Sequence, residues 1–360
     1  MGERKEIVRT HVSFGLQVDK ALEILSIPKS TYYNKRTYNP KGRQATQVTQ
    51  YQGELVSDEI VMKEMKSILS AEFIDYGYRK ITYLLKERGY QIGKKKVYRL
   101  MKENKLLNPK KVNRNPLDKN IIKKKPKPTR PLEIIEIDIK YIYINGQRKN
   151  AYLITIYDTF HREAYEWVLS WSMKVGVIKT LILKFIDNVM ISKNRTKSRI
   201  KITFRTDNGC QFTSKMYMQI MKVFEIETCY IPPATPQLNG HIESFHSTVE
   251  RLVCERYEFQ NLEDAIQVFT RFYNTYNNER ILECLLNKSP KAFLDEWEKG
   301  IIEQKEKKNR LIFFFKEEGK EKKNASCVNS INHFDTTSQS MSSPFEVNLH
   351  NRIFDSARQN

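Results

Sequence analysis

Three carboxylates stand where a folded α/β domain could bring them together. Asp138 lies within the alternating segment EIIEIDIKYIYI, Asp207 precedes an Asn-Gly turn, and Glu243 follows the first apolar residue of an amphipathic stretch. Converging carboxylates repel one another and therefore need cations, and oxygen ligands suit Mg²⁺ or Mn²⁺. Two such ions would activate an attacking oxygen and stabilise a leaving oxygen in phosphoryl transfer.

Each of these carboxylates also has a simpler interpretation. A glutamate in the first turn of a helix, as expected for Glu243, is a favourable partner for the helix dipole. An aspartate before Asn-Gly, such as Asp207, is a common turn residue. The three carboxylates together, beside a basic arm, favour the chemical interpretation.

The surrounding segments predict the elements that would position them. Periodicity indicates strands at 133–144, 151–158, 162–170, 200–209 and 227–233, with helices near 178–189, at 215–224 and from 242 onward. Three strands, a helix, and then strand–helix–strand–helix predict a mixed five-stranded α/β sheet with helices on both faces.

Positive charge is concentrated in the N-terminal third. The 360 residues include 62 Lys and Arg against 42 Asp and Glu, a net charge of +20, and residues 1–130 alone account for +17 of it. Residues 108–131 are proline-rich, with nine Lys and Arg against one Asp, which predicts an extended linker along a phosphate backbone. This asymmetry favours a polyanion-binding arm over a basic surface without a partner.

Two helical pairs in this arm predict helix-turn-helix segments. The first (VDKALEILSIPKSTYYNKR) turns at Ser26-Ile27-Pro28, and the second ends its first helix at Gly89 before a helix that opens with three lysines. Lysines at a helix start oppose the helix dipole, so a phosphate partner explains them better. The candidate DNA-binding residues are Lys29, Ser30, Thr31, Lys94, Lys95, Lys96, Lys123, Lys124, Lys125, Asn208, His246 and Arg280.

Other features limit the class of protein. No apolar run approaches the length of a membrane span, and the N-terminal MGERKEIVRT is not followed by an apolar signal segment. Five scattered cysteines without Cys-x-x-Cys spacing argue against a disulfide framework or a structural zinc site. These features fit a protein of a reducing cytosol.

The motifs together resemble a known family. Asp138 in EIDIKYI, Asp207 in RTDNGCQF and Glu243 in NGHIESF, with 35 residues between the last two, resemble the DDE signature of transposase and retroviral-type integrase cores. With GYRKI, VYRLMKENKLL, YNTYNNER and NKSPKAF, the order is similar to the OrfB transposases of the IS-three insertion-sequence family. The resemblance covers residues 13–297.

The resemblance implies a ribonuclease H-like fold and a DNA transposase. It implies that Asp138, Asp207 and Glu243 hold two Mg²⁺ or Mn²⁺ ions, and that the protein cleaves 3′ ends and transfers strands. It also implies terminal inverted repeats and target DNA as partners, a homo-oligomer on DNA, and a possible upstream reading-frame product. The location implied is the bacterial cytoplasm, at the nucleoid. The sequence departs from the family at Lys140 and Leu282, and at Asp158–Arg162, where a serine is usual before the arginine.

Five regions are expected. They are a helix-turn-helix segment (1–45), a second helical DNA-binding domain (55–107), the basic linker (108–131), the integrase core (132–297) and a disordered or atypical tail (298–360). Two alternatives stay open, a non-catalytic DNA-binding protein from a decayed element and a ribonuclease H-like nuclease.

Overall fold

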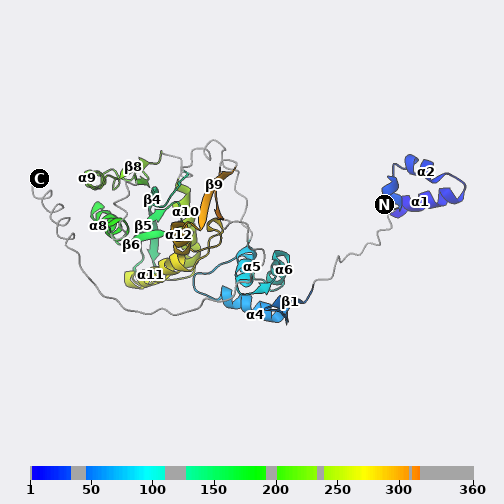
Figure 1. Ribbon diagram of the computed structural model, residues 1–360, viewed down its shortest axis with the longest axis horizontal. Helices are drawn as coiled ribbons and strands as arrows, with labels where there is room; N and C mark the ends of the chain where they lie inside the picture. The colour runs from blue at the N-terminus through cyan, green and yellow to red at the C-terminus, as the bar shows by residue number, and fades with distance from the viewer. Residues whose placement is uncertain are drawn as a thin grey trace, which may run out of the picture. The chain divides into compact units, whose positions relative to one another are not determined.

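The structure of the protein is a computed structural model. It describes residues 2–33, 46–109, 127–191, 201–232, 239–307 and 310–316. Figure 1 shows its helices and strands in chain order. Within these ranges, no helix is long and apolar enough to cross a membrane.

The N-terminal segment is a group of three helices. They are α1 (Gly2–Ser13), α2 (Val18–Ile24) and α3 (Lys29–Tyr33), and the predicted turn between the last two contains Ser26 in a left-handed conformation. Val8, Ala21, Leu22 and Ile27 form its small buried core. The predicted helical pair at 18–36 is therefore confirmed as far as residue 33.

The second helical domain contains a small sheet that the sequence analysis did not predict. Strands β1 (Val48–Tyr51) and β2 (Glu54–Ser57) form a hairpin, and β1 also pairs with β3 (Tyr90–Gln91). The two-residue turn Gln52-Gly53 has positive φ at both positions, as a tight hairpin requires. Gln-Gly is a weaker signal for such a turn than Asn-Gly, so the segment before residue 55 was missed.

Three helices complete this domain, as predicted. They are α4 (Asp58–Leu69), α5 (Tyr78–Glu87) and α6 (Lys94–Glu103). Their apolar faces share a buried core that includes Val61, Met65, Ile81, Leu85 and Val97.

The core domain has the predicted mixed five-stranded sheet, in the order β6-β5-β4-β7-β8. Strands β4 (Ile134–Ile144), β5 (Lys149–Asp158) and β6 (Ala164–Ser170) are antiparallel neighbours. Strands β7 (Thr203–Thr206) and β8 (Glu227–Tyr230) follow, and β7 is parallel to β4. The alternation in β4 sends Ile135 and Ile137 to one face and Glu136 and Asp138 to the other.

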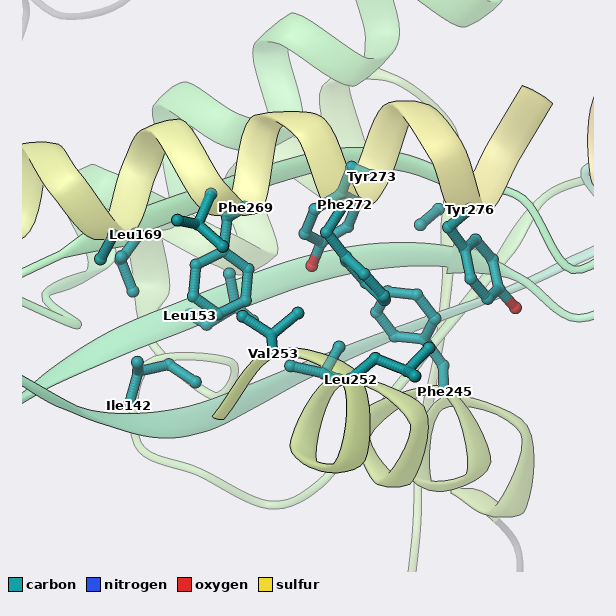
Figure 2. Close-up of a cluster of buried hydrophobic side chains, with 14 of the residues drawn as sticks. Ile142, Leu153, Leu169, Phe245, Leu252, Val253, Phe269, Phe272, Tyr273 and Tyr276 are labelled. Atoms are coloured by element: carbon teal, nitrogen blue, oxygen red, sulfur yellow. The ribbon is translucent and has the colours of Figure 1, made fainter. Parts of the chain in front are cut away.

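Helices cover both faces of this sheet. On one face, α8 (Val175–Phe185), its π-helical extension (Ile186–Ile191) and α9 (Lys215–Val223) share a core with Ile135, Ile137 and Phe204. On the other, α10 (Gly240–Val249), a π-helical turn (Glu250–Cys254) and α11 (Leu262–Asn278) enclose an aromatic core. Figure 2 shows Phe269, Phe272, Tyr273 and Tyr276 of α11 directed toward strand residues such as Leu153.

The segment after α12 (Pro290–Glu298) was expected to be a disordered or atypical tail, and the structure contradicts disorder for residues 302–307 and 310–315. Strands β9 (Ile302–Lys307) and β10 (Arg310–Phe315) form an antiparallel hairpin. The ring of Phe313 lies 4.7 Å from Phe293 and 5.2 Å from Phe160, between centroids. The aromatic partners come from distant segments, so the local sequence did not reveal them. Residues 317–360 lie outside the described ranges.

Candidate active site

The parallel register of β4 and β7 brings Asp138 and Asp207 to the same level of the sheet, where β7 ends and β4 continues. It pairs Glu136 with Arg205, and two residues further along each strand are Asp138 and Asp207. Adjacent strands lie about 4.8 Å apart, and residues two apart point to the same face. The two aspartates therefore occupy neighbouring positions where β7 ends.

The turn after β7 fixes the backbone around Asp207. Its Oδ1 accepts the amide of Gly209 at 3.0 Å, while the side-chain amide of Asn208 donates to the carbonyl of Ile231 at 2.8 Å. The Asp207 side chain is exposed. Asn208 was predicted to contact DNA, but its amide here ties the ends of β7 and β8 together.

Three evenly spaced contacts join the polar face of β4 to α10 and the turn that follows it. The contacts are Ile242 N to Glu136 Oε2 (2.7 Å), His246 Nδ1 to Asp138 Oδ2 (3.3 Å) and Lys140 Nζ to Glu250 Oε2 (2.6 Å). Two residues of a strand cover about 6.6 Å, and four residues of a helix cover about 6.0 Å. Alternate positions of β4 therefore match every fourth position of α10, and the helix lies along the strand.

The buried pair of Glu136 and Arg205 anchors this arrangement. The two side chains are almost fully buried, with Glu136 Oε1 2.7 Å from Arg205 Nη2. Burial raises the pKa of Glu136, and the charges of Arg205 and the Ile242 amide offset only part of that effect. The sequence analysis gave Glu136 no role. The one signal for this role was a basic residue, Arg205, on the strand β7 that pairs with β4.

Glu243 lies in the first turn of α10, directly after the amide that Glu136 holds. Its side chain is exposed, and the Ser247 hydroxyl donates to its carbonyl oxygen at 2.9 Å. The buried contact of Ile242 with β4 therefore fixes the backbone that carries Glu243. Its carboxylate is at the surface of a helix that lies along the strand of Asp138.

The three predicted ligands supply only oxygen donors, which fits Mg²⁺ or Mn²⁺. In the described ranges, no three His, Cys, Asp or Glu side chains are grouped closely enough to hold a metal ion. Both oxygens of Asp138 have partners, because Oδ1 accepts the Ile139 amide and Oδ2 faces His246. The fold thus brings the carboxylates to one region without grouping them into a ligand cluster.

A second aspartate–histidine group lies buried at the end of β5. Oxygens of Asp158 accept the amides of Leu132 (2.8 Å) and Phe160 (2.6 Å), and His161 lies between Asp158 (3.4 Å) and Glu163 (2.9 Å). Burial alone would lower the pKa of His161, but the charges and hydrogen bonds of both carboxylates raise it to about 9. The sequence analysis noted this block only as a departure from the family. The structure shows a buried ionic cluster.

Two residues that were predicted to contact DNA are buried and have partners within the chain. Arg280 is 5% exposed, and its guanidinium bonds Asp75 at 2.6 Å and the carbonyl of Phe73 at 3.0 Å. His246 is 8% exposed and faces Asp138. Arg280 and His246 were predicted to contact DNA from their positions in the sequence alone. In the structure each pairs with an aspartate that lies far away along the chain.

The predicted lysines divide into two groups. Lys94 and Lys95 at the start of α6 are exposed, but Lys96 pairs with Asp58 at 2.5 Å and donates to the carbonyl of Val48 at 2.7 Å. Lys29 is exposed and pairs with an aspartate of α2 at 2.5 Å. Thr31 is half-buried, and the side chain of Ser30 and residues Lys123, Lys124 and Lys125 lie outside the description.

Known protein families match both parts of the chain. Residues 57–114 match the model of an HTH-like domain. Residues 128–236 and 225–290 match two models, each described as an integrase core domain.

Related proteins come from insertion elements. The putative transposase InsK of IS150 from Escherichia coli K12 is 25% identical over 273 residues, which cover 73% of this chain and 88% of that protein. The IS600 31 kDa protein of Shigella sonnei is 25% identical over 285 residues, which cover 76% of this chain and 97% of that protein. The catalytic domain of the Mos1 mariner transposase, at 13% identity, covers 47% of this chain and 76% of that domain, with a TM-score of 0.36. The predicted integrase core and its insertion-element relatives are thereby confirmed.

Proposed function

We propose that this chain, an integrase-core transposase related to those of insertion elements, cleaves and joins DNA with Asp138, Asp207 and Glu243 as its metal ligands. The observation that carries the proposal is the parallel register of β4 and β7, which brings two distant aspartates to one level beside α10. The acceptor and donor DNA would lie over this end of the sheet.

Bound Mg²⁺ or Mn²⁺ would activate the attacking oxygen and stabilise the leaving oxygen of the phosphodiester. The chain itself orients the ligands. His246 holds one oxygen of Asp138, and Glu136 holds the first turn of α10 through the Ile242 amide. Lys140 and Glu250 neutralise each other at the next position along β4. Lys140, at which the sequence departs from the family, therefore has a counter-charge within the chain in Glu250.

The basic arm supplies DNA binding in this proposal. The exposed Lys94 and Lys95 at the start of α6 would contact phosphates, which set the register of a helix-turn-helix unit on DNA. The ends of the element, bound by an oligomer of this chain, would be the substrate. An upstream reading-frame product and a place at the nucleoid stay predictions.

Substitution of each carboxylate tests the proposal. Asp138→Asn, Asp207→Asn and Glu243→Gln should each abolish Mg²⁺-dependent strand transfer on duplexes of the element's ends, while gel-shift affinity stays within about twofold of the unaltered protein. A matched control is Glu227→Gln, because Glu227 lies on β8 in a surface pair with Lys201. Strand transfer by Glu243→Gln at the level of this control would refute the assignment.

A second measurement reads the metal site without activity. Fe²⁺ can replace Mg²⁺ and cleave the nearby backbone through hydroxyl radicals. The proposal predicts cleavage near Asp138, Asp207 and Glu243 that each substitution suppresses. Backbone cleavage at other positions would show that the metal ions bind elsewhere in the chain.

A further inference from the structure

A cavity of about 270 Å³ lies beside α10, among residues that the proposed reaction does not use. Its lining includes Arg162, Ser244, Phe245, Tyr276 and Cys284. A water molecule in the liquid has a share of about 30 Å³, so this space exceeds what one ordered water fills. The cavity is therefore large enough for a ligand group.

Arg162 brings a positive charge to the lining of this cavity. Its Nη1 is buried, and no hydrogen-bond partner for it occurs among the described residues. A buried donor without a partner costs free energy, and a charged one costs more. Arg162 also has φ of 66°, a left-handed conformation uncommon outside glycine. The chain thus keeps one buried guanidinium nitrogen without a hydrogen-bond partner, on a residue with a left-handed backbone.

The buried cluster at Asp158 holds that strained turn. The amide of Arg162 donates to the carbonyl of Asp158 at 3.1 Å, and His161 just before it is fixed by Asp158 and Glu163. The backbone of Arg162 is therefore held beside this buried group of ion pairs.

No carboxylate among the described lining residues is available to pair with Arg162. Of the described residues that line the cavity, none is Asp or Glu. Glu136 interacts with the charge of Arg162, but its oxygens already bind Arg205 and the Ile242 amide. Burial raises the pKa of Tyr276 to about 12, so its hydroxyl stays neutral. The cavity is therefore electropositive and lacks an anion of its own.

We infer that this cavity receives one nucleotide of the bound DNA strand, with its phosphate paired to the Arg162 guanidinium. An arginine fork matches the geometry of a phosphate, and aromatic walls such as Phe245 and Tyr276 suit a sugar or a base. The inference deepens the proposed function and rests on it, because DNA must pass α10.

The position of the cavity on α10 supports this ligand. Ser244, in its lining, directly follows Glu243. A helix is about 10 Å across with its side chains, so both sides of α10 lie within reach of neighbouring nucleotides. A strand whose phosphodiester lies at Glu243 can place an adjacent nucleotide in the cavity.

A disulfide cross-link from Cys284 tests the inference. In the full chain, Cys210, Cys229, Cys254 and Cys327 are replaced by Ser, which leaves the thiol in the cavity wall. Duplexes of the element's ends then carry a thiol-tethered base at one position each. Cross-links at one or two adjacent positions are expected, and Arg162→Met should lower their yield about tenfold or more.

The controls separate this inference from the proposed function. Arg162→Lys should recover part of the yield because it keeps the charge, and Arg162→Gly removes the guanidinium while relieving the left-handed strain. Cross-links spread evenly along the DNA, or insensitive to Arg162→Met and Arg162→Gly, would overturn the inference. The cross-link needs no catalysis, so it reports on the cavity even if Asp138→Asn leaves strand transfer unchanged.

Discussion

Two aspartates on neighbouring strands each face the Nδ1 of a histidine, yet they lie in opposite environments. Asp138 on β4 is 3.3 Å from His246, with its side chain 26% exposed. Asp158 at the end of β5 is 3.4 Å from His161, and both side chains are fully buried. In the buried group, two backbone amides donate to the carboxylate, and the ring of His161 lies beside it. In the pair of Asp138 and His246, part of the Asp138 side chain remains accessible to solvent. The same residue types thus form a buried structural group at one place and a partly exposed pair at the other.

The largest expected effect comes from breaking the buried group. Asp158→Ala removes the acceptor of two backbone amides and leaves His161 with a reduced counter-charge, so the free energy of unfolding should fall by about 3–5 kcal/mol. Asp138→Ala should lower it by less than about 1 kcal/mol, because its pair is partly exposed. Urea denaturation of the two variants measures both. Equal losses would erase the contrast between the two sites.

The hairpin of β9 and β10 packs against the same buried turn and tests its support. Phe313 contacts Phe160, which follows Asp158 by two residues, and Trp297. Phe313→Ala should cost about 3 kcal/mol of stability. Phe315, 48% exposed, is the control, and Phe315→Ala should cost well under 1 kcal/mol. Thermal unfolding measures both losses. Equal losses of stability for the two variants would show that the hairpin does not pack against the core through Phe313.

The pH dependence of stability sharpens the comparison. The pKa of His161 is about 9 in the folded protein against 6.5 for an ordinary histidine, so its contribution is complete below pH 6.5 and is lost as pH rises to 9. The contribution is on the order of 3 kcal/mol. Lys80, whose pKa burial lowers to about 8, opposes this trend above pH 8.

The difference between the unaltered protein and His161→Gln isolates the histidine from Lys80. It should shrink across pH 6.5–9 in denaturation experiments. A difference that stays constant over this range would show that His161 is neutral in the folded protein.

The smallest effect distinguishes exposed from paired lysines on α6. Lys94→Gln and Lys95→Gln should each reduce the slope of log K against log [salt] for DNA binding by about 0.9. Lys96→Gln should leave the slope unchanged and lower stability instead, because Lys96 pairs with Asp58. Salt titrations of the three variants decide whether exposure at the start of α6 identifies the phosphate contacts.

The sequence by itself determined the elements whose periodicity is local. Alternation in β4 and helical spacing in α4 and α10 follow from the pleat of a strand and the turn of a helix, so the mixed sheet and the helical domain were predicted. The hairpins at 48–57 and 302–315 were missed because a weak turn signal and distant aromatic partners define them.

Tertiary structure alone decided which polar residues are free to act. Arg280 looked like a DNA contact until Asp75, some 200 positions earlier, proved to be its partner. Asp158 and Asp138 both lie in strands rich in apolar residues, and only burial makes the first a structural ion and leaves the second partly exposed. The physical reason is that desolvation and pairing depend on which segments pack together, and no local pattern encodes the partner that a charged side chain will meet.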